Sequence, residues 1–300
     1  MKLLKSLKKP AVYFAIYLGM QILVSAIIGV FLGVYVGATS TDPTTISTNI
    51  AEIIQRNVFV ISLVASLVTL FIYNLMLKRR GNSLVKMCGV KKVSIKNVTL
   101  IVIMGTCLAF LSSIVVGLLQ EFFTDYSTIS DSINSVTDVV RNTSGEVSEG
   151  GVVQTRSTLQ VVMAWLGMFS MIIGVPVFEE VLFRGLIFNS LKNHLKIGGC
   201  VVVSAIIFGI AHMNILQGIY ACFLGALLAI VYYKTKTIWA PIIMHVVYNF
   251  FGGFAITIIA EKLGEKIFLI LVGVAAVVLP ITIIIFLKNN KVERQIQIEA

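Results

Sequence analysis

Seven long runs without a charged residue divide this chain of 300 residues, and each run is 21 to 37 residues long. A helix that crosses a bilayer needs about 20 mostly apolar residues, so every run is long enough to form one. The chain is 57% hydrophobic and 13% charged, whereas about 25% of the residues of a soluble domain are charged. We therefore predict an all-α, polytopic membrane protein that forms one integral membrane domain over residues 1–300. The runs are 10–41, 57–77, 97–120, 157–178, 197–233, 237–260 and 267–287.

The fifth run is interrupted by polar residues at 212–218. We read it as two shorter helices joined by a tight turn, which gives about eight transmembrane helices. The first run is longer than the apolar region of a cleavable signal peptide, which has about 7–15 residues. We therefore expect residues 10–41 to be retained as the first span.

Positive charges gather in alternate connections between these spans. The segments 1–9, 78–96, 184–196, 234–236 and 288–300 hold 19 of the 24 Lys and Arg residues. Because Lys and Arg accumulate in cytoplasmic loops, we expect both termini in the cytoplasm and the polar loop 121–156 outside the cell. Topology is then a sufficient explanation of the formal net charge of +10.

Two adjacent carboxylates and an arginine follow the fourth charge-free run. Glu180 and Arg184 are four residues apart, so on a helix they share one face and can pair. Glu179 points about 100° away from Glu180 and is left to face a cavity. Pro176 removes a backbone donor and is expected to kink the helix. We predict that this cluster lies at the cytoplasmic end of the fourth span.

Two of the three histidines interrupt apolar runs. His212 follows two small residues, Gly209 and Ala211, which allow another helix to approach closely. His245 and Asn249 are four residues apart and therefore lie on one helix face. Each of these groups also has a purely structural interpretation, as a helix-end residue or as a hydrogen-bonded pair between helices.

The carboxylate, the imidazoles and the amide together fit hydrolysis of a peptide bond. A carboxylate can take a proton from water, an imidazole can hold that water, and neutral donors can stabilise an oxyanion. Glu179, His212 and His245 could equally bind zinc, although the helical His-Glu-x-x-His spacing is absent. We therefore leave zinc and no cofactor as two alternatives. No nucleic-acid-binding motif is present, and we expect no nucleic-acid partner.

Three short motifs in order resemble the CPBP family, which contains the CAAX prenyl proteases of the Rce type and the bacterial Abi proteins. The family's motifs are Glu-Glu-x-x-x-Arg, Phe-x-x-x-His and His-x-x-x-Asn or Asp. All three are intact within about a quarter of the chain, and we expect the catalytic core at 157–260. Here the motifs read Glu179-Glu180-Val-Leu-Phe-Arg184, Phe208-Gly-Ile-Ala-His212 and His245-Val-Val-Tyr-Asn249.

The resemblance implies an intramembrane endopeptidase. By this analogy Glu179 is the general base, His212 helps it to orient water, and His245 and Asn249 stabilise the oxyanion. Glu180 and Arg184 then support the site. The family has been described both as metalloproteases and as metal-independent glutamate-type proteases, and the sequence does not decide between these.

We expect the protein to act near the cytoplasmic face of a membrane, which the composition suggests is that of a bacterial cell. Its partners are membrane lipids and a membrane-associated peptide or protein substrate. The alternatives are a non-enzymatic binding or bacteriocin-immunity protein and a proton-coupled transporter, because intramembrane carboxylates and histidines also form proton relays.

Straight helices would place the three main groups at different depths. Glu179 would lie near the cytoplasmic side, His245 about 12 Å in and His212 about 22 Å in, at 1.5 Å per residue. A kink at Pro176 or a strong helix tilt is needed to bring them together.

Overall fold

The computed structural model describes residues 2–38, 43–122, 131, 133, 137, 146–149, 152–155 and 158–290. The described part is almost wholly helical, which confirms the all-α prediction. The short antiparallel hairpin of β1 (Glu146–Glu149) and β2 (Val152–Thr155) is the exception. It lies in the expected loop 121–156, most of which is outside the described residues.

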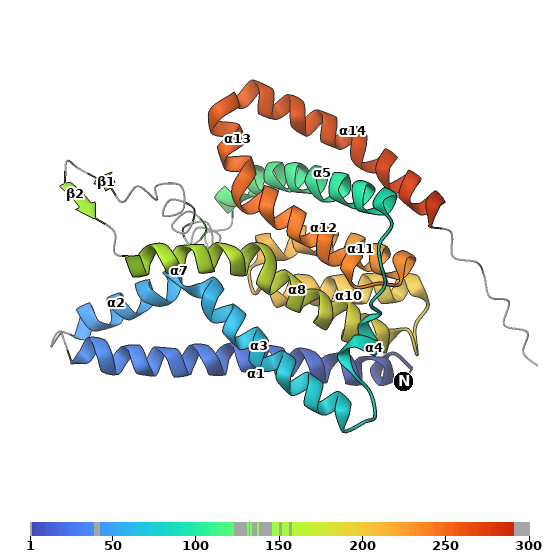
Figure 1. The fold of residues 1–300 in the computed structure, drawn as a ribbon, viewed down its shortest axis with the longest axis horizontal. Coiled ribbons are helices and arrows are strands. Elements are labelled where there is room, and N and C mark those ends of the chain that lie inside the picture. Colours follow the sequence, from blue (N-terminus) through green and yellow to red (C-terminus); the bar gives the residue numbers. More distant parts are fainter. Residues whose placement is uncertain are drawn as a thin grey trace, which may run out of the picture.

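The first helices form one side of the molecule (Figure 1). The long helix α1 (Lys2–Gly37) packs along α3 (Val58–Lys78), and α2 (Pro43–Arg56) connects them. The short helix α4 (Leu84–Cys88) follows α3. The side chain of Ser83 caps it by accepting a hydrogen bond from the backbone N–H of Lys86, as N-cap serines do.

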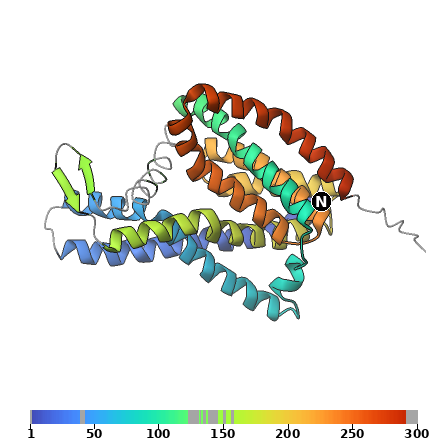
Figure 2. The same cartoon turned by 45° about the horizontal axis from the view of Figure 1, so that its top comes forward.

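The fourth long helix runs through the middle of the molecule, between α1–α3 and the later helices (Figures 1 and 2). It contacts α1 and α3 on one side and α10 and α12 on the other. Its successive parts are α7 (Thr158–Phe169), the π-helical η2 (Ser170–Gly174), α8 (Val175–Glu180), the π-helical η3 (Val181–Phe188) and α9 (Asn189–Leu191).

The remaining helices pack on the other side of this central helix. The antiparallel pair α10 and α11 lies beside α12, while α5 packs against both α12 and α14. These elements are α5 (Ile95–Leu119) with the 3-10 turn η1 (Gln120–Phe122), α10 (Ile197–Ala211), α11 (Ile215–Thr235), α12 (Trp239–Phe250), the π-helical η4 (Phe251–Ala255), α13 (Ile256–Leu263) and α14 (Glu265–Asn289).

Seven helices in the described residues are long and apolar enough to cross a membrane. The predicted division of 197–233 into two helices is confirmed. However, α10 has only 15 residues, or about 22 Å, against a hydrocarbon core of about 30 Å. The expected count of eight spans is therefore reduced to seven, with α10 as a shorter eighth helix.

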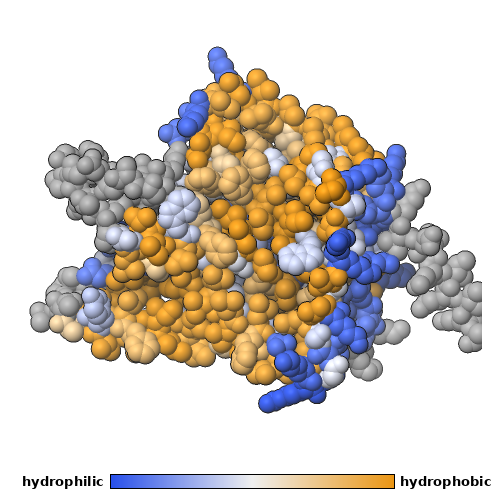
Figure 3. Space-filling view, in the orientation of Figure 1, coloured by the Kyte–Doolittle hydropathy of each residue, from blue (hydrophilic) through white to orange (hydrophobic). Residues whose placement is uncertain are grey.

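Hydrophilic side chains gather at one end of the molecule, where α1 begins and α14 ends (Figure 3). We call this the basic end, and the opposite end, where α2 lies, the α2 end. Between the two ends the surface is mainly apolar. The charged side chains of the basic end include Lys8, Lys9, Lys78, Arg79, Arg80, Lys86, Lys91, Lys92, Lys96, Lys192, Lys196, Lys234, Lys236 and Lys288.

Three hydrogen bonds join distant segments at the basic end. The Thr237 hydroxyl accepts from the backbone N–H of Lys91 at 3.1 Å and donates to the carbonyl of Lys91 at 2.8 Å. The N–H of Ile238 donates to the carbonyl of Gly89 at 2.9 Å. Gly89 has φ +66°, and a Cβ there would lie 2.9 Å from the carbonyl oxygen of Lys236. We call this contact the clasp, and it requires glycine at position 89.

Candidate active site

The paired carboxylates lie inside the fourth long helix. This helix continues to Leu191, 12 residues beyond Glu179, which is about 18 Å at 1.5 Å per residue. The prediction that the cluster marks the end of the span is therefore wrong. The exposed fractions of Glu179, Glu180 and Arg184 are 8%, 0% and 1%. Because these charges are buried inside the protein, they do not mark the membrane surface. The charge-free run 157–178 therefore ends before the helix does.

A π-helical segment stands where a distortion by Pro176 was expected. At its end the N–H of Val175 donates to the carbonyl of Ser170, five residues back. The next bond of this kind would need an N–H from Pro176, which has none. The carbonyl of Met171 is therefore left without that helical donor.

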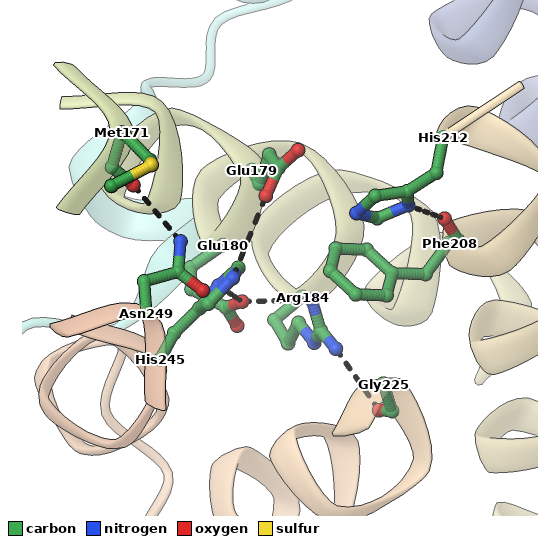
Figure 4. Close-up of polar contacts among 9 residues, drawn as sticks. All are labelled: Met171, Glu179, Glu180, Arg184, Phe208, His212, Gly225, His245 and Asn249. Carbon is green, nitrogen blue, oxygen red and sulfur yellow. Dashed lines mark hydrogen bonds and ion pairs between the residues drawn. The ribbon is translucent and has the colours of Figure 1, made fainter. Parts of the chain in front are cut away.

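Asn249, on α12, supplies the missing donor. Its Nδ2 donates to the carbonyl oxygen of Met171 at 2.9 Å, as Figure 4 shows. The resemblance to the family implied that this amide donates a hydrogen bond to the oxyanion. In the structure, one of its two N–H groups already donates to a backbone carbonyl. Asn249 therefore also ties α12 to the distorted part of the central helix.

Glu180, Arg184 and His245 form a buried group that we call the inner cluster. Glu180 Oε1 accepts from Arg184 Nη1 at 2.8 Å and from His245 Nδ1 at 2.9 Å. Arg184 Nη2 donates to the carbonyl of Gly225 on α11 at 3.0 Å. Its guanidinium carbon lies 4.7 Å from the ring centroid of Phe208, within cation–π range. The predicted pairing of Glu180 with Arg184 is confirmed, and the cluster joins the central helix to α11 and α12.

Glu179 and His212 lie beside this cluster and form what we call the cavity pair (Figure 4). Glu179 Oε2 is 3.7 Å from His245 Nε2, which is longer than a hydrogen bond. His212 Nδ1 is 2.8 Å from the carbonyl oxygen of Phe208. Because a carbonyl only accepts, Nδ1 carries the proton, and in the neutral ring Nε2 is an acceptor.

The ring of Phe208 holds the two imidazoles in place. Its centroid lies 4.9 Å from that of His212 and 5.7 Å from that of His245, and both contacts are edge-on. Phe183 packs edge-on against the same ring at 4.9 Å. The first residue of the Phe-x-x-x-His motif is thus the packing centre between the histidines.

All three predicted main groups line one cavity of about 840 Å³. Glu179 Oε2 lies 3.7 Å from His245 Nε2, and both imidazoles contact the Phe208 ring, so the wide separation expected for straight helices is not found. The central helix extends farther toward the basic end than expected, which places Glu179 deeper. Asn249 also lines the cavity.

The rest of the cavity wall is mostly apolar, with a few hydroxyl and amide groups. Glu179 is the only acidic side chain among the described residues that line it, and no Lys or Arg lines it there. Such a wall is suited to an uncharged ligand, because an unpaired charge is costly in an apolar environment. The uncharged polar side chains include Gln55, Ser62, Ser112, Ser113, Gln217 and Thr257.

The residues considered for a metal are not arranged as a metal site. Within the described parts of the chain, no group of three or more His, Cys, Asp or Glu side chains could hold a metal ion. This applies to Glu179, His212 and His245 as they are placed. We therefore assign no chemical step to a metal.

Two contributors to the site had no signal in the sequence. Tyr17 on α1 lines the cavity and stacks on Phe178 at 5.5 Å between centroids. Gly225 supplies a carbonyl to Arg184, and a Cβ there would lie 2.9 Å from the Phe208 ring. A tyrosine and a glycine in apolar helices are common, so only the tertiary contacts identify them.

The fold and this site define a polytopic membrane protein with a carboxylate and two imidazoles in a cavity between its helices. Residues 161–251 match the family described as type II CAAX prenyl endopeptidase Rce1-like. This stretch contains all three motifs, so the resemblance to the CPBP family is confirmed over these residues.

A relative in Bacillus subtilis (strain 168), named "Putative membrane peptidase YdiL", is 33% identical over 99 residues. The similarity covers 32% of this chain and 40% of the relative, so the chain spans about two fifths of that protein's length. No solved structure matches the chain.

Proposed function

We propose that the protein is an intramembrane endopeptidase that hydrolyses a peptide bond of a membrane-associated peptide or protein. One observation carries this proposal: the buried Glu179 carboxylate meets two imidazoles at the wall of a cavity large enough for a peptide segment. The match of residues 161–251 to a family of prenyl endopeptidases supports it, as does the name of the relative.

In the proposed mechanism Glu179 is the general base. A water molecule in the cavity donates one hydrogen bond to the Glu179 carboxylate and one to Nε2 of His212. The oxygen lone pair of this water then attacks the carbonyl carbon of the substrate, while Glu179 takes a proton from it. The same proton passes from Glu179 to the leaving amine when the C–N bond breaks.

His245 and Asn249 are the proposed oxyanion donors. His245 already donates from Nδ1 to Glu180, so donation from Nε2 requires the doubly protonated ring. Asn249 has a second N–H besides the one bonded to Met171, and this N–H is the proposed donor to the oxyanion.

We also propose that the basic end lies in the cytoplasm, with both termini, in the membrane of a bacterial cell. The support is the charge pattern: the connecting segments at this end are rich in Lys and Arg and contain no Asp or Glu between residues 78 and 96 or between 184 and 196. Positive loops of this kind are retained on the cytoplasmic side.

The test is cleavage of a peptide library by the purified protein in detergent, with new termini mapped by mass spectrometry. We expect the wild-type protein to cleave and Glu179→Gln to lose at least about 100-fold in rate, as expected for the loss of a general base. The control is Glu265→Gln, the same substitution at an exposed position in the first turn of α14. Equal cleavage by the wild-type protein and Glu179→Gln would overturn the proposal.

The same assay addresses the two alternatives left for the cofactor. Metal analysis of the purified protein and cleavage with and without a chelator separate a metalloprotease from a metal-independent glutamate-type protease. In the latter case we expect cleavage to be unchanged by the chelator.

A further inference from the structure

The cavity occupies one half of the length of the surrounding helices. Helices α3 and α11 begin toward the α2 end, and their lining residues lie near their starts, for example Ser62 and Gln217. Helix α5 and the helix formed by α12, η4 and α13 end toward the α2 end. Their lining residues lie in their later parts, for example Ser112 and Thr257. The cavity therefore extends from Glu179 toward the α2 end.

The other half of the molecule is packed. Along the central helix, Glu179 is the last residue on the way to the basic end that lines the cavity. The next large side chains, Phe183, Leu186 and Phe188, are 0% exposed. Phe208 from α10 closes this side and is also 0% exposed. No lining residue comes from the segments 78–96 or 184–210 of the described chain.

Three of the four exposed residues of the cavity wall lie at the α2 end, and the fourth, Gly252, lies in η4. Val58, at the start of α3, is 39% exposed. Ala51 on α2 and Thr257 on α13 are also exposed. Glu179 and His245, by contrast, are buried, with 8% and 2% exposed. The cavity thus opens toward the α2 end and is closed toward the basic end.

From this geometry we infer that the substrate reaches the site from the extracytoplasmic side. The charge pattern assigns the basic end to the cytoplasm, so the mouth of the cavity faces the other side of the membrane. The substrate is then an uncharged polypeptide segment in, or entering from, the outer half of the bilayer. This differs from the expectation of action near the cytoplasmic face. That the bound segment is a substrate rests on the proposed function, whereas the side from which the cavity is reached does not.

Cysteine accessibility tests the side of access without any substrate. Ser62→Cys and Ser112→Cys place a thiol of nearly the same size on the cavity wall. Lys262→Cys, exposed at the end of α13, and Lys86→Cys, exposed at the basic end, report the two sides. A small, membrane-impermeant quaternary-ammonium methanethiosulfonate is added to spheroplasts or to inverted vesicles. The unsubstituted protein measures labelling of its four native cysteines.

We expect Ser62→Cys, Ser112→Cys and Lys262→Cys to be labelled in spheroplasts, and Lys86→Cys only in inverted vesicles. Cavity thiols that react only in inverted vesicles would overturn the inference, as would labelling of Lys86→Cys in spheroplasts. Cavity thiols that react in neither preparation would also overturn it, because the cavity would then be closed. A failure of peptide cleavage with the expected labelling would contradict the proposed function alone.

Discussion

The inner cluster and the cavity pair are adjacent, but their carboxylates lie in different environments. The carboxylate of Glu180 in the inner cluster accepts hydrogen bonds from Arg184 and His245 and has no exposed surface. Glu179, the adjacent residue, lies beyond hydrogen-bond distance of His245 and borders a cavity. One step along the helix thus separates a carboxylate that joins helices from one that borders a cavity and is the proposed general base. From this comparison we expect that substitutions can alter stability and activity separately.

Removal of Arg184 is the strongest way to break the inner cluster. In Arg184→Ala the Glu180 carboxylate would be buried without its main partner, which costs about 3–5 kcal/mol. We expect a large loss of thermal stability in detergent. The control is Arg56→Ala, because Arg56 and Glu52 also pair four residues apart, with side chains 59% and 52% exposed. Exposed pairs of this kind contribute about 0.3–0.5 kcal/mol, so equal losses in the two variants would contradict the comparison.

The position of His212 depends on the close contact between α10 and α11. A Cβ at Gly209 would lie 2.7 Å from the carbonyl oxygen of Gly218 and 2.3 Å from Cys222 Sγ. We expect Gly209→Ala to destabilise the protein by up to about 3 kcal/mol through helix displacement and to lower activity further by moving His212.

The matched control is Gly198→Ala, in the same helix, where a Cβ would meet nothing within 4 Å. Because Ala is the better helix former by about 1 kcal/mol, we expect unchanged or slightly raised stability. Thermal unfolding in detergent measures both variants. A destabilised Gly198→Ala with an unaffected Gly209→Ala would show that close packing does not position His212.

Asn249 borders the cavity and also donates a hydrogen bond to the backbone carbonyl of Met171. Asn249→Ala removes the donor to the Met171 carbonyl, and we expect a stability loss of about 1 kcal/mol or somewhat more. Asn57→Ala is the control. Its side chain also donates to a carbonyl, that of Ile53, at 2.8 Å, but the backbone N–H of Asn57 bonds to the same oxygen. A smaller loss is expected there, and thermal unfolding compares the two.

Glu179→Gln is expected to have the smallest effect on stability. The amide has the same shape, and the separation of 3.7 Å between Glu179 Oε2 and His245 Nε2 is longer than a hydrogen bond. We expect a change within about 0.5 kcal/mol, as for substitutions that break no named interaction, although activity is lost. A stability loss comparable to that of Arg184→Ala would place Glu179 in the inner cluster.

The sequence predicted the helices, and which of the polar side chains share a helix face, for physical reasons. Long apolar runs have few alternatives to transmembrane helices, and spacing of four residues fixes which side chains share a helix face. The pairing of Glu180 with Arg184 and the separate direction of Glu179 follow from these two rules. The division of 197–233 followed from the polar residues around His212.

The predictions from the sequence that were wrong or incomplete concern features that depend on tertiary contacts. The end of the fourth helix was placed at Phe178 because the burial of Glu179, Glu180 and Arg184 is not visible in a charge pattern. The partner of Asn249 is a carbonyl that only the π-helical segment before Pro176 leaves open. Helix α2 was not expected, because residues 43–56 are not apolar enough to appear as a run.

The clasp at the basic end has a consequence for biosynthesis. Lys91 and its partner Thr237 are 146 residues apart, and ribosomes add about 5–20 residues each second. The segment after α4 therefore waits some seconds for the turn that receives it, and α5 to α11 enter the membrane in the meantime. The locking of the early helices onto the later ones can thus begin only once residue 237 has been synthesised, when the polypeptide has supplied every group of the site except His245 and Asn249.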